Sequence, residues 1–370
     1  MILTGGGARA AYQVGVLLAV DKLANHSRRN PFPILCGASA GAINAAGVAC
    51  LADHFARAAA ILAEVWRNMR AADVYRADIT GVGLSGARWL STLALGWLLR
   101  KSPVSLLDNA PLRTLLTRHL DFKGIERALA RGALHAICIS ASGYESGENI
   151  SFFQGQPTAA PWRRINRLGI RAQIGVEHLL ASSAIPFLFP ATRIHREFFG
   201  DGSMRQLAPI SPAIHLGAER IFIVGASRSG EQNERRPVDR HPSLAQIAGH
   251  ALASIFLDSL DADIERIQRI NQTLASMPEE IRARANIPLR PIKTLVITPS
   301  QPLDRIAAEH ASALPWPVKA LLRGIGAMNR NGGALTSYLL FEKPYTQALI
   351  DLGYADTMAR DTEVGDFLQL

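Results

Sequence analysis

The stretch Ile34-Leu35-Cys36-Gly37-Ala38-Ser39-Ala40-Gly41-Ala42-Ile43-Asn44-Ala45 decides the expected fold. It is predicted to form a strand, a sharp turn of small residues and a helix, with Ser39 in the middle of a G-x-S-x-G pentapeptide. Gly37 and Gly41 suit such a turn because neighbouring backbone comes very close to a serine held in strained geometry. The helix that begins near Ala40 points free N–H groups toward Ser39 and would stabilise negative charge there. The stretch therefore predicts a nucleophile suited to acyl transfer.

A second glycine-rich segment opens the chain. Ile2-Leu3-Thr4 predicts a short strand, residues 5–10 a loop and residues 11–20 a helix. This order is typical of a cradle for a phosphate or an oxyanion, and its G-x-G-x-x-A pattern also fits a dinucleotide fingerprint. That fingerprint needs an acidic residue about twenty positions later, at the end of a second strand. Asp21 falls at the end of the first helix instead, and the next strand ends in Ser39, so an oxyanion cradle is favoured.

A candidate base follows later in the chain. Arg193 to Phe199 alternates like a strand and stops at Gly200-Asp201-Gly202-Ser203. An Asp-Gly pair alone is more often a plain turn. The chain also has the sharp turn around Ser39, called the elbow below, and the glycine loop. In this combination Asp201 becomes the second catalytic candidate, and Gly202 lets neighbouring backbone come close to it. Because an ordinary aspartate, with a pKa near ~3.9, is a weak base, its site should be partly desolvated.

A histidine base is the alternative to Asp201. In a Ser-His-Asp triad, His195, His215 or His250 would take the proton from the serine, and the sequence cannot place these rings.

Composition limits the class of protein. The 370 residues are 48% hydrophobic, yet no run approaches the ~18 consecutive apolar residues of a membrane-spanning helix. The N-terminus has neither a charged region nor a long apolar region of a signal peptide, so a cytoplasmic protein is expected. Cys36, Cys50 and Cys138 are scattered, which indicates free thiols and no metal site.

The net charge of +9 fits either an anionic lipid surface or nucleic acid. Arg228, Arg235, Arg236 and Arg240 cluster, but no nucleic-acid-binding motif accompanies them, so no nucleic-acid partner is expected. Two apolar segments with tryptophan and basic residues, Trp89 to Leu99 and Trp316 to Arg323, suit interfacial helices. Peripheral contact with an anionic inner-membrane surface is therefore one interpretation, and core helices or a cover over the active site are the other.

With these motifs assembled, the chain resembles the patatin-like phospholipase family, and its bacterial members in particular. Four blocks carry the resemblance, and they lie within residues 1–226: residues 5–10, 37–41, 181–187 and 201–203. The resemblance implies an α/β three-layer sandwich, with a central, largely parallel sheet and helices on both faces. It implies no metal and no cofactor.

The resemblance also assigns the site. It makes Ser39 the nucleophile and Asp201 the base of a dyad without histidine, and it implies an oxyanion hole built from Gly5, Gly6, Gly7, Ala8 and Arg9. The family usually has glycine at position 10 and Gly or Ala at position 203, where this chain has Ala10 and Ser203. Ala10 could narrow the conformations of the loop, and Ser203 could hydrogen-bond the base.

The implied function is a lipid acyl hydrolase, of the phospholipase A or lysophospholipase type, that works through an acyl-serine intermediate. The alternatives are an acyltransferase or a general carboxylesterase on the same site, or a membrane-associated scaffold with a vestigial site. Residues 1–226 are expected to form the catalytic core, with a candidate cap or interfacial segment at about 73–108. Residues 227–370 are expected to form a mainly helical extension with one further strand, packed on the same domain. The oligomeric state is left open.

Overall fold

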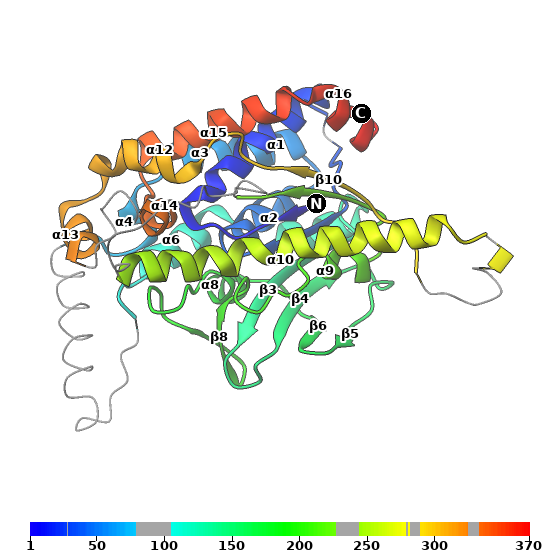
Figure 1. Ribbon diagram of the computed structural model, residues 1–370, viewed down its shortest axis with the longest axis horizontal. Helices are drawn as coiled ribbons and strands as arrows, with labels where there is room; N and C mark the ends of the chain where they lie inside the picture. Colours follow the sequence, from blue (N-terminus) through cyan, green and yellow to red (C-terminus); the bar gives the residue numbers. More distant parts are fainter. Residues whose placement is uncertain (28, 79–104, 227–243, 279, 282–288, 325–332) are drawn as a thin grey trace, which may run out of the picture.

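A computed structural model describes the chain except for residues 28, 79–104, 227–243, 279, 282–288 and 325–332 (Figure 1). The segment from Trp89 to Leu99, most of the expected cap and the arginine cluster at 228–240 lie outside the described residues. The side chain of His250 is not described either.

One mixed sheet forms the centre of the molecule. Among the described residues it has ten strands, in the order β10-β9-β1-β2-β3-β4-β6-β5, with β8 paired to β3 and β7 to β8. The five strands from β10 to β3 run parallel. The expected α/β fold with a largely parallel sheet is confirmed. The strands are β1 Ile2–Leu3, β2 Ile34–Ala38, β3 Ala136–Gly143, β4 Asn149–Gly155, β5 Trp162–Arg164, β6 Arg167–Arg171, β7 Thr192–Ile194, β8 Glu197–Asp201, β9 Arg220–Val224 and β10 Lys293–Ile297.

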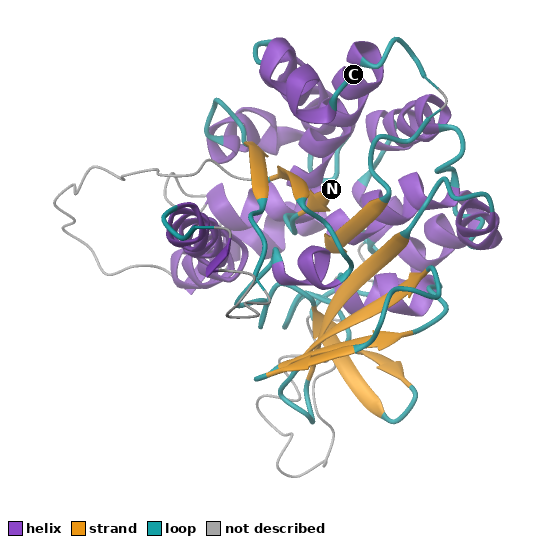
Figure 2. Cartoon of the chain, turned by 90° about the vertical axis from the view of Figure 1, so that its right-hand side faces the viewer, coloured by secondary structure: helices purple, strands orange, loops and turns teal. Residues whose placement is uncertain are grey.

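Helices cover both faces of this sheet (Figures 1 and 2). Alternate residues of β2 show why: Leu35 joins one hydrophobic cluster with α1, α2, α3 and α15, while Ile34 and Cys36 join another with α9 and α10. The helices are η1 Gly7–Ala10, α1 Ala11–Leu23, α2 Ala40–Cys50, α3 Phe55–Arg67, α4 Ala71–Val74, α6 Ala110–His119, α7 Lys123–Ala130, α8 Val176–Ser182, α9 Ser211–His215, α10 Leu244–Ala275, α12 Leu303–His310, η2 Ala311–Ala313, α13 Trp316–Gly324, α14 Gly333–Leu339, α15 Lys343–Met358 and α16 Asp361–Leu368.

The strand expected from Arg193 to Phe199 is wrong in one respect. The chain reverses at His195, whose φ of 53° is left-handed, and forms the hairpin β7–β8. The residues of this hairpin alternate as those of a single strand would. Periodicity therefore could not distinguish a hairpin from one strand. The reversal directs β8 back to pair with β3, and this pairing places Asp201 opposite Ala141.

The C-terminal helix α15 packs closely on α1. A Cβ on Gly15 would lie 2.0 Å from the carbonyl oxygen of Ile350, and one on Gly353 would lie 2.1 Å from that of Tyr12. The Tyr12 hydroxyl donates a 3.0 Å hydrogen bond to Asp356 Oδ2. Residues beyond 226 thus supply both an edge strand, β10, and a helix in direct backbone contact with α1.

Helix α13 is the second segment considered above as interfacial. Its Val318 and Leu322 are buried, while Trp316 is 63% exposed. Within the described ranges, no helix has the length and apolar character needed to cross a bilayer.

Gly353→Ala should destabilise the protein, because the added methyl has no room between α15 and α1. We expect a cost of roughly 1–3 kcal/mol in the free energy of unfolding. Gly365→Ala on α16 is the matched control, since a Cβ there would meet nothing within 4 Å and alanine favours a helix. Thermal melts of both variants check this, and equal melting temperatures would contradict the close packing of the two helices.

Candidate active site

The elbow around Ser39 is built as its sequence predicts. Ser39 joins β2 to α2 with φ 54° and ψ −132°, a strained conformation for a residue with a side chain. A Cβ on Gly41 would lie 2.3 Å from the Leu3 carbonyl oxygen, and one on Gly37 would lie 2.6 Å from the Cα of Ala42. Each glycine of the G-x-S-x-G motif is therefore required by a backbone contact.

The glycine loop turns directly into a short 3-10 helix, η1, that leads into α1. Gly7 has a φ of 55° and lines the same cavity as Ser39. The Arg9 N–H donates to the Gly6 carbonyl oxygen at 3.1 Å, so this expected oxyanion donor is already occupied. Ala10 has an ordinary helical φ of −66°, so alanine at this position causes no strain.

A buried network ties the glycine loop to the serine helix. Asn44 of α2 donates to the carbonyl oxygen of Ala10 at 3.1 Å and to Gln13 Oε1 at 2.9 Å. It also accepts a 2.8 Å hydrogen bond from the Trp66 indole. Gln13 in turn donates to the Thr4 carbonyl oxygen at 2.7 Å. Asn44 lies next to the end of the stretch Ile34 to Ala45, but nothing in the residue pattern singled it out.

Asp201 is the last residue of β8, and backbone hydrogen bonds fix its position. Its N–H donates to the Ala184 carbonyl oxygen at 2.9 Å, and the Gly202 N–H donates to that of Ser182 at 3.0 Å. A Cβ on Gly202 would lie only 2.0 Å from the Ser140 carbonyl oxygen. The glycine after the aspartate thus permits β3 to press directly against the base.

Burial raises the pKa of Asp201 to about 6, and interactions with the Ser39 and Ser203 side chains and the Ser203 N–H oppose the rise. The Ser203 N–H donates to Oδ1 at 2.9 Å. Oδ2 and the Ser203 hydroxyl have no partner in hydrogen-bond geometry among the described residues, although the Ser39 hydroxyl lies near enough to lower the pKa. The carboxyl is thus a stronger base than an ordinary aspartate.

Ser182 links the two candidate residues and was not predicted to do so. Its hydroxyl accepts a 2.9 Å hydrogen bond from the Ser39 N–H and donates a 2.6 Å bond to the Ser140 carbonyl oxygen. Ser140 lies on β3, one residue before the partner of Asp201. The motif Ala181 to Phe187 was noted in the sequence, yet only the spatial arrangement identifies which serine connects the elbow to the base.

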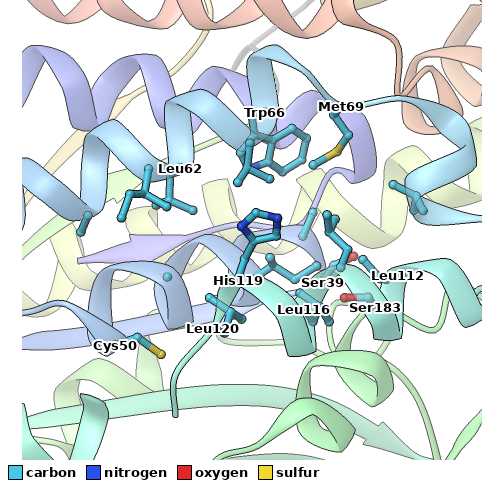
Figure 3. A pocket seen from close by; sticks show the side chains of 18 of the residues that line it. Ser39, Cys50, Leu62, Trp66, Met69, Leu112, Leu116, His119, Leu120 and Ser183 are labelled. Atoms are coloured by element: carbon cyan, nitrogen blue, oxygen red, sulfur yellow. The ribbon is translucent and has the colours of Figure 1, made fainter. Parts of the chain in front are cut away.

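An apolar cavity of about 260 Å³ opens beside Ser39 (Figure 3). Helix α2 forms one wall through Ile43 and Gly47, and it carries Ser39 and Cys50 at opposite ends of the cavity. Side chains from α3 and α6, including Leu62, Trp66, Leu112 and Leu116, form much of the other walls, and Ile185, Phe189 and Phe341 contribute as well. The cavity runs along about 16 Å of α2, estimated from the rise of 1.5 Å per residue. Such a shape suits an extended hydrocarbon chain.

Two of the histidines considered as an alternative base, His195 and His215, do not line the cavity. His195 is exposed at the β7–β8 turn. His215 stacks on Trp162 with 5.0 Å between ring centroids, and burial together with three arginines lowers its pKa to about 4. His119, which the sequence did not single out, does line the cavity. Among the described side chains, no three His, Cys, Asp or Glu residues form a metal-binding group.

Comparison with known proteins identifies the family. The family model for patatin-like phospholipases matches residues 1–214, more than half of the chain. The chain belongs to this family. A cGAMP-activated phospholipase of Pseudomonas aeruginosa (strain BWHPSA011 / Pa011) is 27% identical over 210 residues, which are 56% of this chain and 53% of that protein. The chain therefore spans about half the length of this curated relative.

Among solved structures, VipD from Legionella pneumophila aligns over 95% of this chain and 66% of its own, with 11% identity and a TM-score of 0.36.

Asp201→Asn should stabilise the protein, and the gain should grow with pH. Because the folded pKa is raised from 3.8 to about 6, the folded state binds more protons than the unfolded state between these values. The free energy of unfolding therefore falls as pH rises through this window. Above about pH 6 the Asp201 carboxylate is ionised, and its destabilising effect is fully present.

Removing the charge should add on the order of 2 kcal/mol at pH 8 and little at pH 4. Thermal melts at both pH values measure this. Asp351→Asn, at an exposed position of α15, is the control and should change little. Equal stability of wild type and Asp201→Asn at pH 8 would argue against a costly buried charge.

Proposed function

We propose that the protein hydrolyses carboxyl esters of phospholipids or lysophospholipids through an acyl-Ser39 intermediate, with Asp201 as the base. The observation that carries the proposal is that Ser39, which lines an apolar cavity, lies near enough to the buried Asp201 carboxyl to lower its pKa. Membership of the patatin-like phospholipase family supports lipid acyl hydrolysis, and the name of the Pseudomonas relative supports a phospholipid substrate.

Acylation begins when an ester carbonyl lies beside Ser39. Asp201 accepts the hydroxyl proton while Ser39 Oγ bonds to the carbonyl carbon, and negative charge moves to the carbonyl oxygen. N–H groups of Gly5, Gly6, Gly7 and Ala8 in the glycine loop, joined by the N-terminus of α2, stabilise that oxygen, whereas the Arg9 N–H already donates to the Gly6 carbonyl oxygen. Such donors are typically worth about 3 kcal/mol each in the transition state. The bond to the leaving oxygen then breaks, and Asp201 returns the proton to it.

Deacylation repeats these steps with water. Asp201 removes a proton from a water molecule, whose oxygen attacks the acyl-Ser39 carbonyl carbon. The Ser39 ester bond then breaks, and Ser39 Oγ regains a proton from Asp201. A free fatty acid leaves, and both side chains return to their starting protonation states.

The cavity supports a lipid acyl chain as the group bound next to Ser39. Its walls are largely apolar, and Gly7 and Ser183 line it together with Ser39. Four polar or charged residues also line it: Arg57, His119, Asp121 and Arg127. An acyl chain laid along α2 would place its carbonyl at the helix N-terminus and its methyl end toward Cys50 (Figure 3). This orientation matches the direction in which the helix dipole stabilises the oxyanion.

Fluorophosphonate labelling and ester hydrolysis test the catalytic residues. Ser39→Ala should abolish both, and Asp201→Asn should lower kcat by about a hundredfold or more. His215→Ala, whose ring stacks on Trp162, should keep activity. In wild type, kcat/KM should rise with pH through about 6, because Asp201 must be ionised to accept a proton.

Labelling that survives in folded Ser39→Ala would place the nucleophile elsewhere. If His119→Ala lost as much activity as Asp201→Asn, a histidine base would replace the dyad.

Ile43→Trp tests whether the acyl chain lies along α2. Ile43 lines the cavity one helical turn beyond Ser39, so a larger side chain should shorten the space available to the chain. We expect kcat/KM for long-chain p-nitrophenyl esters to fall by roughly tenfold or more, while that for the butyrate ester changes little. Ile165→Trp, at a position 88% exposed on the β5–β6 turn, is the matched control. An equal loss for long and short esters would contradict this placement.

A further inference from the structure

Arg9 connects the glycine loop to the C-terminal part of the chain. Its guanidinium is buried and makes an ion pair with Asp304 of α12. Its Nε donates to the Ser337 hydroxyl at 2.8 Å, and this hydroxyl donates to Asp304 Oδ1 at 3.0 Å. The guanidinium carbon also lies 4.1 Å from the centre of the Tyr338 ring. Arg9, Asp304, Ser337 and Tyr338 together are called the Arg9 cluster below.

A backbone contact joins the same two regions. Gly7 has a φ of 55°, and a Cβ there would lie 2.3 Å from the Tyr338 carbonyl oxygen. The end of α14 therefore presses on the residue of the glycine loop that lines the Ser39 cavity. The side chain of Arg9 and the backbone of Gly7 are both in contact with α14, so the loop is held at two points.

The partners of Arg9 are themselves well anchored. Helices α12 and α14 pack against each other (Figure 1). The Tyr75 hydroxyl donates to the Leu339 carbonyl oxygen at 2.8 Å, and the Tyr345 hydroxyl donates to that of Leu303 at 3.4 Å. Leu303 and Leu339 are buried in the main core. A rigid support of this kind can fix the position of a flexible glycine loop.

The ion pair is the part of the cluster that a single substitution can test. The Arg9 side chain is 5% exposed and carries a permanent charge, while Asp304 is 47% exposed. Replacing Asp304 by a neutral residue removes this negative charge from the surroundings of a buried cation, which is unfavourable. With this ion pair lost, the guanidinium is held less firmly, and we expect the loop of residues 7–10 to open more often.

We propose that Asp304, Ser337 and Tyr338 are positioning residues that fix the oxyanion loop through Arg9 and Gly7. They lie beyond the residues that the family model matches, so the C-terminal helices would act directly on the catalytic geometry. The catalytic consequence rests on the proposed function, in which this loop stabilises the oxyanion. The mechanical consequence, a loop held in place by Asp304, does not depend on it.

The experiment compares Asp304→Asn with Glu309→Gln in the full chain. Both substitutions remove one negative charge from α12, but Glu309 pairs at 3.6 Å with Arg305 on the same helix. Hydrogen exchange by mass spectrometry reports the loop peptide containing residues 5–10. Hydrolysis of p-nitrophenyl butyrate and the rate of fluorophosphonate labelling report the reactivity of Ser39.

In Asp304→Asn the loop amides should exchange roughly tenfold faster than in wild type. With the oxyanion donors displaced, kcat should fall by about tenfold to a hundredfold with little change in KM. Glu309→Gln should match wild type in each measurement. Asp304→Glu, which keeps the carboxylate, should recover part of the loss, and Ser337→Ala should shift exchange in the same direction as Asp304→Asn.

Unchanged loop exchange in Asp304→Asn would overturn the proposal. If that variant does not fold, unchanged exchange in Ser337→Ala overturns it instead. Faster loop exchange in a chain whose Ser39 is never labelled would support the mechanical role and would count against the proposed function alone.

Discussion

The contact on which the candidate site depends is that between helix α2 and strand β1 at Gly41. The helix approaches so closely that a methyl group at this position would lie 2.3 Å from the Leu3 carbonyl oxygen. Because the chain leaves β1 into the glycine loop, this approach places the loop beside the nucleophile at the carboxyl ends of two parallel strands. Open α/β sheets commonly bind ligands at that edge. Gly202 makes the equivalent contact for the base, against Ser140 of β3.

These contacts hold groups that are unfavourable by themselves. Ser39 has strained backbone geometry, and Asp201 is a buried carboxyl whose pKa is raised to about 6. Strain of this kind typically costs about 1–3 kcal/mol and persists only where the surrounding structure enforces it. Here the enforcing elements are β3, α8 and β8. The Ser182 hydroxyl of α8 connects the elbow to β3, and the Gly202 N–H next to β8 donates to the Ser182 carbonyl oxygen. The site thus depends on rigidity in its surroundings.

The local parts of this arrangement could be predicted from the sequence. The elbow at Ser39, the glycine loop and the need to desolvate Asp201 follow from residue types and short-range spacing, because each is a local backbone or solvation requirement. The turn at His195 could not be predicted, because the apolar alternation of β7 and β8 is the same for a hairpin and for one strand. Ser182 and Asn44 are ordinary polar residues, and only long-range contacts give them a role. The cavity and the Arg9 cluster combine segments that are far apart in the chain, which periodicity cannot relate.

In the proposed mechanism, Ser39 carries the acyl group during turnover. This role is tested most directly by mixing the protein with a phospholipid, quenching with acid within the first turnovers and mapping peptides by mass spectrometry. The peptide containing Ser39 should gain the mass of one acyl chain, and this species should form at least as fast as fatty acid is released. Steady hydrolysis without acylated Ser39, or an acyl group on another residue, would contradict the mechanism.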